Sequence, residues 1–361
     1  MRKIQKNDYK KLDLYENRYA LTESVPSELK YGNSGNGNKP FISFVIPTYN
    51  RPVELGETID SILKQPEVCQ YEIVVVDNSA NMNKDNETYK LICRYNNPKI
   101  NYYINRENIG MEGNWNRCIT LARGKYISMV HDDDLLCEDY MEEIIRCIKN
   151  AEELGGEVGV IKTSYVDYKE GTPVENISNR HRGGIKRYYK LDCLIKGIGP
   201  TSCPTCGIIF NKKAAIDAGG FDSTFYPSSD YILGYQMIRK GYRAYVTEDK
   251  LGLYRIGINE SIRKENVIGF CICDCYFRNY MYRQNVFNYI YGLIFEKVEY
   301  SMSVRGQRDN GLKFGVDIPI EEFIIKKGYG EYRYMSRIYN KTRHILSRLT
   351  SKIYEYKGED K

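Results

Sequence analysis

Residues 71–79 read YEIVVVDNS, and this stretch decides the fold class of the 361-residue chain. Four consecutive apolar residues, 73–76, make both faces of an extended strand apolar. A strand of that kind is covered on both sides, as in a parallel sheet flanked by helices. The polar residues Asp77, Asn78 and Ser79 follow at the point where this strand ends.

Strand-like and helix-like segments alternate around this stretch. Short apolar runs predict further strands at residues 41–47, 100–104, 125–130 and 158–168. Periodic or polar helix-forming runs predict helices at residues 52–65, 85–95, 113–122 and 138–154. This alternation implies βαβ units with right-handed crossovers. The predicted fold class is therefore α/β, with an open, mostly parallel, Rossmann-like sheet flanked by helices.

Polar clusters follow the first four predicted strands. They are Pro47-Thr48-Tyr49-Asn50-Arg51, Asp77-Asn78-Ser79, Asn108-Ile109-Gly110 and His131-Asp132-Asp133-Asp134. Ligands of open α/β sheets bind beyond the carboxyl ends of the strands. We therefore expect these clusters to lie together at one edge of the sheet and to form a binding site.

Asp132, Asp133 and Asp134 are adjacent carboxylates, which raise one another's pKa unless a cation or hydrogen-bond donors compensate them. A divalent cation, Mg²⁺ or Mn²⁺, would compensate them and bridge to substrate phosphates. The alternative is a solvated acidic turn before the next helix. Asp77 can accept hydrogen bonds from a nucleobase imide or a ribose hydroxyl, or it can be a turn residue. Because GxxxxGK[ST] and GxGxxG are both absent, we expect neither a P-loop nor a nicotinamide site.

Charge and cysteine content narrow the class of protein. The net charge of +6 is too small for a histone-like nucleic-acid binder. Residues 1–261 hold 35 basic and 35 acidic side chains, whereas residues 262–361 hold 18 and 12. The 11 cysteines are scattered, the CxxC pair Cys203/Cys206 has no second pair, and the N-terminus has no secretory apolar core. We expect a reduced, cytoplasmic protein whose thiols are structural.

Several motifs together resemble the family 2 glycosyltransferases, which have the GT-A fold. They are FVIPTYNRP (44–52), EIVVVDNS (72–79), Asn108-x-Gly110 with Asn116, GKYISMVHDDD (124–134), GGFD (219–222), SSDYILGYQMIRKGYR (228–243) and LYRIGINES (253–261). The resemblance spans residues 41–261. It implies an inverting transferase that uses a nucleotide-diphosphate sugar, UDP-linked in our hypothesis, and a divalent cation.

The resemblance also implies a role for each matching residue. Asp230 would be the catalytic base, and Asp133 the metal ligand with Asp132 and Asp134 beside it. The implied donor-binding residues are Pro47, Thr48, Tyr49, Asn50, Arg51, Asp77, Asn108, Gly110, Asp132 and Arg255. Without the resemblance, a carboxylate at a helix start would be the preferred interpretation of Asp230.

Three positions depart from the family pattern. Asp is common in place of His131, Glu usually stands at Ser229, and many members have His at Gly257. The leading hypothesis is transfer to a hydroxyl of a glycan or lipid-linked acceptor in polysaccharide or glycoconjugate biosynthesis. The second hypothesis is a non-catalytic sugar-nucleotide-binding or scaffold protein on the same fold.

The chain divides into a polar extension and linker (residues 1–40), a GT-A domain (41–261) and a basic, tyrosine-rich helical region (262–361). Residues 270–304 predict a helix with a broad apolar surface, and the uncharged apolar stretch 286–295 is shorter than the ~20 residues of a membrane span. Three interpretations stay open for this region. It can be a helical cap or homodimer interface, a contact with the inner face of the membrane, or, least favoured, a nucleic-acid site.

Overall fold

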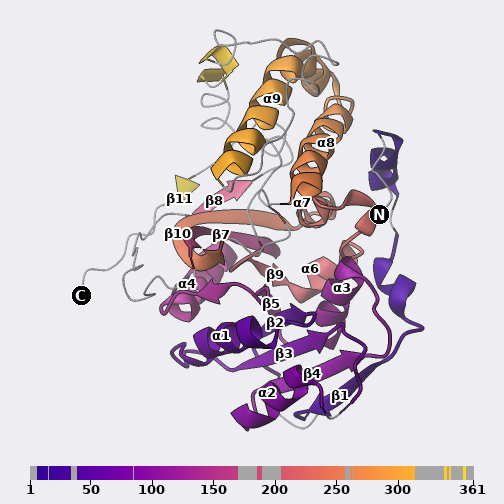
Figure 1. Cartoon of the computed structure of the whole chain (residues 1–361). Coiled ribbons are helices and arrows are strands. Elements are labelled where there is room, and N and C mark those ends of the chain that lie inside the picture. The colour runs from indigo at the N-terminus through magenta and orange to yellow at the C-terminus, as the bar shows by residue number, and fades with distance from the viewer. Residues whose placement is uncertain are drawn as a thin grey trace.

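The computed structural model describes residues 6–14, 16–33, 39–83, 85–169, 185–188, 205–256, 261, 263–313, 337–339, 341–342 and 353–354. These residues form one sheet between two helical layers, with a pair of long helices at one end (Figure 1). The strand order is β1-β4-β3-β2-β5-β9-β7-β10-β8-β11, and β6 pairs with β10 outside this path.

The first half of the sheet is parallel, as predicted. It consists of β2 (Ile42–Thr48), β3 (Tyr71–Asp77), β4 (Ile100–Asn105) and β5 (Tyr126–Met129). The connecting helices are α1 (Pro52–Leu63), α2 (Glu87–Tyr95) and α3 (Met111–Leu121). Strand β2 runs parallel to both β3 and β5, and β3 runs parallel to β4. Every residue of β3 is buried, which confirms that this strand is covered on both faces.

The second half of the sheet is mixed. Its strands are β6 (Leu135–Leu136), β7 (Val158–Tyr168), β8 (Ile185–Tyr188), β9 (Ile209–Asn211), β10 (Arg243–Arg255) and β11 (Ile353–Tyr354). Strand β7 is parallel to β10, but β9 is antiparallel to both β5 and β7. Strands β6 and β8 also run antiparallel to β10. The α/β class is confirmed, and the parallel order that the sequence predicted is confined to the first half.

The N-terminal residues contribute to the fold, which the sequence did not predict. They form two short 3₁₀ helices, η1 (Lys6–Asp13) and η2 (Arg18–Thr22), followed by β1 (Ser27–Tyr31). Strand β1 lies antiparallel to β4 at the edge of the sheet. The division that treated residues 1–40 as an extension and linker is therefore corrected for residues 27–31, and linker residues 34–38 lie outside the described part.

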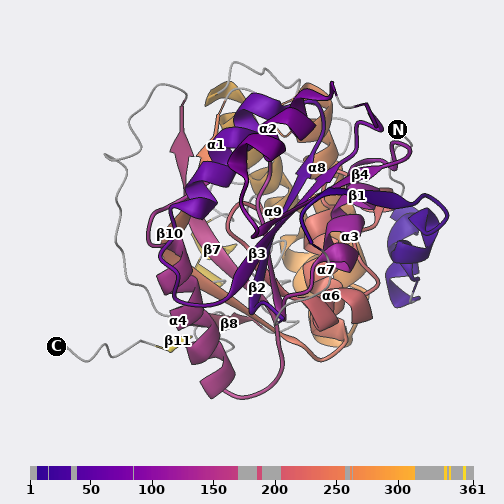
Figure 2. The ribbon, with the colours of Figure 1, turned by 90° about the horizontal axis from the view of Figure 1, so that it is seen from below.

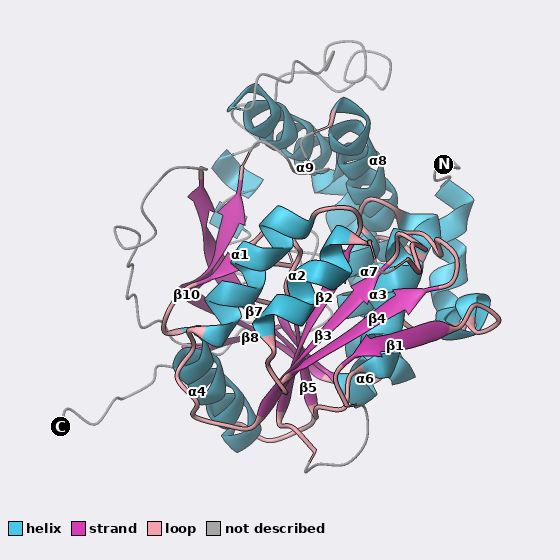
Figure 3. Ribbon diagram, turned by 60° about the horizontal axis from the view of Figure 1, so that its bottom comes forward, coloured by secondary structure: helices cyan, strands magenta, loops and turns pink. Residues whose placement is uncertain are grey.

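Helices cover both faces of the sheet (Figures 2 and 3). Helices α1, α2 and α4 (Tyr140–Glu153) pack their apolar side chains against one face of the sheet and form a single cluster with it. Helices α3, α6 (Lys212–Asp217) and α7 (Ser229–Arg239) share the cluster on the other face. The site residues at the strand ends are therefore fixed between two packed layers.

The C-terminal region begins with two helices, α8 (Lys264–Met281) and α9 (Val286–Lys313), which pack side by side (Figure 1). The single helix predicted over residues 270–304 is thus wrong, because the chain turns between the two helices. They share an apolar cluster with η1, α7 and the short 3₁₀ helix η5 (Ser223–Phe225). Most of the Tyr/Arg/Lys-rich segment 329–356 lies outside the described residues. Of the helices that the structure describes, none is both long and apolar enough to span a membrane.

Candidate active site

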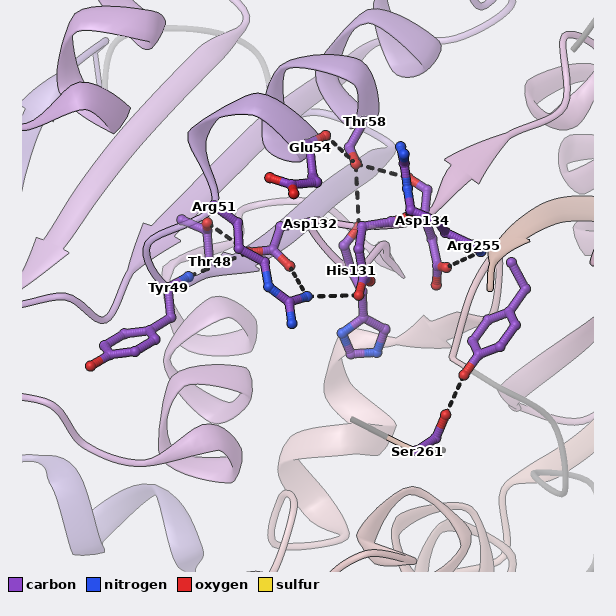
Figure 4. Close-up of polar contacts among 12 residues, drawn as sticks. Thr48, Tyr49, Arg51, Glu54, Thr58, His131, Asp132, Asp134, Arg255 and Ser261 are labelled. Carbon is purple, nitrogen blue, oxygen red and sulfur yellow. Dashed lines mark hydrogen bonds and ion pairs between the residues drawn. The ribbon is translucent and has the colours of Figure 1, made fainter. Parts of the chain in front are cut away.

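The ends of β2 and β5 bring the first and fourth polar clusters together, as predicted (Figure 4). Thr48 Oγ1 donates a 2.8 Å hydrogen bond to Asp132 Oδ2, and the Tyr49 amide donates one of 3.4 Å to the same oxygen. Arg51 Nη1 lies 2.7 Å from Asp133 Oδ2 and 3.5 Å from Asp132 Oδ1. One guanidinium is therefore the counter-ion of two carboxylates at the edge of the sheet.

The other residues of segment 47–51 shape the turn from β2 into α1. Pro47 lies within β2 opposite Val76 of β3. Asn50 has a φ of 55°, the left-handed conformation that asparagine tolerates, and it reverses the chain before α1. Tyr49 is 52% exposed, so one face of its ring can stack on a planar ligand such as a nucleobase.

Burial sets the three adjacent carboxylates apart from a solvated turn. Asp132, Asp133 and Asp134 expose only 7%, 6% and 1% of their surface. The three residues are therefore not a solvated acidic turn. Burial, with the charge of Asp133 as the second cause, raises the pKa of Asp132 to about 7. The same two causes raise the pKa of Asp134 well above its ordinary value. Such a cluster attracts further positive charge.

Strand β6 follows the acidic cluster directly in sequence and pairs with the end of β10. This pairing brings Arg255, the last residue of β10, to the acidic cluster. The Arg255 amide donates a 3.2 Å hydrogen bond to Asp134 Oδ1, and its Nε donates one of 2.9 Å to the Asp133 carbonyl. Its guanidinium also forms an ion pair with Glu57 and lies 5.4 Å from the centroid of the Tyr168 ring. Asp134 thus binds the backbone of β10 instead of sharing a cation with the other two acidic side chains.

Asp77 lies at the same edge, but the protein itself occupies its carboxylate. The Tyr102 hydroxyl and the Asn86 amide donate to Oδ2 at 2.7 and 3.3 Å. The Ser79 amide donates to Oδ1 at 2.8 Å, the contact of a turn aspartate. Because Asp77 is 0% exposed, its direct contact with a nucleobase stays a prediction that requires these neighbours to move.

An asparagine network holds the loop after β4. Asn78 Nδ2 donates to Asn108 Oδ1 at 2.9 Å and to the Gly110 carbonyl at 3.1 Å, and Asn78 Oδ1 accepts from Asn105 Nδ2 at 3.0 Å. Asn105 Nδ2 also donates to Asn114 Oδ1 at 2.9 Å. The predicted residues Asn108 and Gly110 are therefore at the edge, in contacts that shape the backbone. Sequence reasoning missed Asn105, the last residue of β4, and Asn114 of α3, because no motif distinguishes them from other polar residues.

His131 connects the acidic cluster to α3. Its Nε2 forms a hydrogen bond with the Thr205 hydroxyl, and its ring centroid lies 5.1 Å from that of Trp115 on α3. Trp115 also packs against Phe221, at 5.0 Å. Burial lowers the pKa of His131, so the ring is neutral at pH 7. A neutral aromatic residue therefore stands where the family often has Asp.

Asp230 is the second residue of α7 and is half-buried. Its Oδ1 accepts a 2.9 Å hydrogen bond from the Tyr231 amide, as expected of a carboxylate at a helix start. Burial raises the pKa of Asp230 to about 7, with a smaller contribution from the charge of Glu112, while Lys162 opposes the rise. A carboxyl group with a pKa near the working pH is suited to general base catalysis.

The donor set fits a divalent cation with few protein ligands. Among the described residues, no three His, Cys, Asp or Glu side chains form a metal-binding group. Magnesium in phosphate-transferring sites is often held by one or two carboxylates and substrate oxygens. Asp132 Oδ1 and Asp133 Oδ2 already converge on one cationic atom of Arg51, so this pair could hold such an ion. A metal-ligand role for Asp134 stays a prediction.

The structure describes only one cysteine of the CxxC pair, Cys206. Cys206 is buried, with its Sγ 3.7 Å from the Leu135 carbonyl, which favours the interpretation as a structural thiol. Cys203 lies outside the described residues.

Comparison with known proteins agrees with this geometry. Residues 43–217 match the family model described as Glycosyl transferase family 2. Residues 43–217 are a family 2 glycosyltransferase domain. The chain is 24% identical over 253 residues to an uncharacterized glycosyltransferase of Methanocaldococcus jannaschii, covering 68% of the chain and 82% of the relative. The chain spans 64% and 57% of the length of two further relatives, less than two thirds of each.

Two solved structures share the fold of this chain with a TM-score of 0.50. One is residues 1–349 of TarS from S. aureus in complex with UDP-GlcNAc, 15% identical, covering 88% of this chain and 97% of that one. The other is the mannosyltransferase PcManGT from Pyrobaculum calidifontis in complex with GDP-Man and Mn²⁺, 16% identical, covering 94% of each chain. The likeness confirms the GT-A fold. The residues matched by the family model end before Asp230 and Arg255, whose roles remain predictions.

Proposed function

We propose that this glycosyltransferase moves a sugar from a UDP-linked donor to a hydroxyl of a glycan or lipid-linked acceptor, with inversion at the anomeric carbon. The observation that carries the proposal is the difference in environment between Asp230 and the pair Asp132 and Asp133. Asp132 and Asp133 share one positive charge, whereas Asp230 is half-buried, has no counter-ion at bonding distance in the described residues, and has a pKa of about 7. Carboxyl groups in such different environments take different roles.

The donor diphosphate would lie between Arg51 and Arg255. Both guanidinium groups contact the acidic cluster from opposite sides, Arg51 from the end of β2 and Arg255 from the end of β10. Planar guanidinium groups bind phosphate oxygens in bidentate fashion. The exposed ring of Tyr49 could then stack on the base. The UDP-GlcNAc bound to TarS supports a UDP-sugar as the first donor to try.

Asp132 and Asp133 would hold the divalent cation, Mn²⁺ or Mg²⁺. When bound, the ion supplies positive charge to the departing diphosphate. The Mn²⁺ in the mannosyltransferase complex supports this choice of cofactor. The protein's own contribution is to present two buried carboxylates from one turn, held by Thr48 and Arg51.

Asp230 would take the proton from the acceptor hydroxyl as its oxygen attacks the anomeric carbon. The bond to the diphosphate breaks as the new glycosidic bond forms, so a single displacement inverts the configuration. The nucleotide diphosphate leaves with the electron pair of the broken bond. This route needs one base and no covalent enzyme intermediate.

The test begins with a panel of nucleotide sugars and Mn²⁺, read by thermal shift, because a ligand of the folded state raises the melting temperature. Donors that bind are then assayed for released nucleotide diphosphate. We expect Asp230→Asn to abolish release while the donor-induced thermal shift persists. Asp217→Asn, on α6 outside the site, is the matched control. Full release by Asp230→Asn would refute the base, and binding without turnover in the wild type would favour the scaffold hypothesis.

The acceptor side of the proposal includes attachment to the inner face of the membrane. The first turns of α9 expose a stripe of large apolar side chains: Val286, Phe287, Tyr289, Ile290, Leu293 and Ile294. Exposed Arg283 and Lys297 flank this stripe at either end. An apolar helix face with cations beside it is typical of interfacial binding to anionic lipid.

Co-sedimentation with vesicles tests the attachment. We expect binding to vesicles that contain phosphatidylglycerol, weaker binding to pure phosphatidylcholine, and loss of binding in Leu293→Glu. Leu21→Glu, at a 75% exposed apolar residue of η2, is the matched control and should bind like the wild type. Equal binding by wild type and Leu293→Glu would refute the attachment. A homodimer that Leu293→Glu dissociates would assign the stripe to a second copy of the chain.

A further inference from the structure

The guanidinium of Arg255, which the proposed function places beside the donor diphosphate, is already occupied by the protein. Its Nε donates to the Asp133 carbonyl at 2.9 Å, its Nη2 forms an ion pair with the Glu57 carboxylate, and it lies 5.4 Å from the centroid of the Tyr168 ring. Only 2% of the Arg255 side chain is exposed. A diphosphate can therefore reach this guanidinium only when one of its present partners gives way.

Glu57 is the partner that can leave. The Asp133 carbonyl belongs to the backbone of the acidic turn, and Tyr168 is a buried residue of β7. Glu57 stands on α1, and 47% of its side chain is exposed. Its carboxylate can exchange the arginine for water by rotation about side-chain bonds. An ion pair with a partner exposed to this extent contributes little to stability, so its opening costs little free energy.

The helix that carries Glu57 is fixed against the acidic turn. Thr58 Oγ1 donates a 2.8 Å hydrogen bond to the Asp134 carbonyl (Figure 4). Beyond the end of α1, Gln65 Nε2 donates one of 2.8 Å to the Cys137 carbonyl. Because these bonds hold the backbone of α1 in place, the exchange moves only the side chain of Glu57.

A carboxylate and a phosphate group bind a guanidinium in the same way. Both present oxygen atoms to its planar N–H groups, often two at a time. The Glu57 carboxylate therefore occupies a place on Arg255 that a phosphate oxygen would take. Since the two anions also repel each other, a bound diphosphate favours the conformation in which Glu57 points into solvent.

We infer that Glu57 competes with the diphosphate group for Arg255. In the ligand-free protein, Glu57 balances the charge of the guanidinium. It swings into solvent when the donor binds, and it returns when the nucleotide diphosphate leaves. Glu57 thereby lowers the affinity for donor and product alike and hastens product release. The inference rests on the proposed function and adds to it a residue that sets the affinity for the diphosphate.

The test measures the dissociation constants of UDP and GDP by calorimetric titration of the full chain in the presence of Mn²⁺. We expect Glu57→Gln to tighten binding of the nucleotide about fivefold, the effect of one half-exposed ion pair. Glu54→Gln is the matched control, because it removes the same charge from the first turn of α1. It should bind the nucleotide like the wild type.

Each result decides the inference. Unchanged or weaker nucleotide binding by Glu57→Gln overturns it, as does equal tightening in Glu54→Gln, which would mean that only the charge of the helix matters. The thermal shift induced by the nucleotide is a second measure, and it should be larger in Glu57→Gln than in the wild type. Failure of the wild type to bind either nucleotide would instead count against the proposed function itself, which separates the two failures.

Discussion

Acidification below neutrality should slow transfer about tenfold per pH unit, because Asp230 must be ionised to accept a proton. Burial raises the pKa of Asp230 from its ordinary value of 3.8 to about 7. A group with this pKa is about one tenth ionised at pH 6 and about nine tenths ionised at pH 8. The rate at saturating donor should therefore rise about tenfold from pH 6 to pH 8 and level off above that. With an ordinary Asp the rate would hardly change over this range.

The assay is the initial rate of nucleotide diphosphate release at constant ionic strength and saturating donor. Because burial also raises the pKa of Asp132 to about 7, donor affinity is measured separately at each pH by thermal shift. A loss confined to donor affinity would belong to Asp132, whereas a loss of rate at saturation belongs to the base. Asp230→Asn, in which we expect release to be abolished, should show no such rise over this range.

One result would refute the reasoning directly. A rate at saturating donor that stays flat between about pH 5.5 and pH 8 would mean that the base is fully ionised there. Asp230 would then either be solvated, in contrast to its position in α7, or not be the base.

Three further predictions concern stability and cofactor. Tyr102→Phe removes the 2.7 Å hydrogen bond to buried Asp77 and should lower the free energy of unfolding by about 2 kcal/mol in a denaturant titration. Glu299→Gln removes the charge that pairs with buried Arg278 at 2.9 Å and should lower the free energy of unfolding by about 3 kcal/mol. The loss is no larger because Asp274 still binds that arginine at 2.8 Å. An unchanged melting temperature would contradict either one. Chelation by EDTA should abolish nucleotide diphosphate release, and excess Mn²⁺ should restore it; release that survives EDTA would remove the cation from the proposal.

The parallel half of the sheet was predictable because its signal is local. Each strand from β2 to β5 is an apolar run followed by a polar cluster, and hydrophobic periodicity marks the helices between them. The edges were not predictable. Strand β1 reads SELKY, with one apolar aliphatic residue, and β9 has only three residues. They form strands because they pair with neighbouring strands, and no local sequence pattern marks them.

The site divides in the same way. The strand-end residues were found because the carboxyl ends of parallel strands meet at one edge. The asparagine network was missed because its hydrogen bonds join Asn78, Asn105 and Asn114, which stand on three different segments of the chain.

Helix α7, which carries Asp230, is packed by both ends of the chain. Gln236 donates a 3.1 Å hydrogen bond to the Leu12 carbonyl of η1, and Tyr235 packs its ring 5.1 Å from that of Phe277 on α8. A version trimmed to the residues that the family model matches, 43–217, would lose the base itself and both of its supports. A shortened version of the protein should therefore keep the chain from η1 through α9. Tags should be placed where they do not disturb the packing of η1 and α8 on α7.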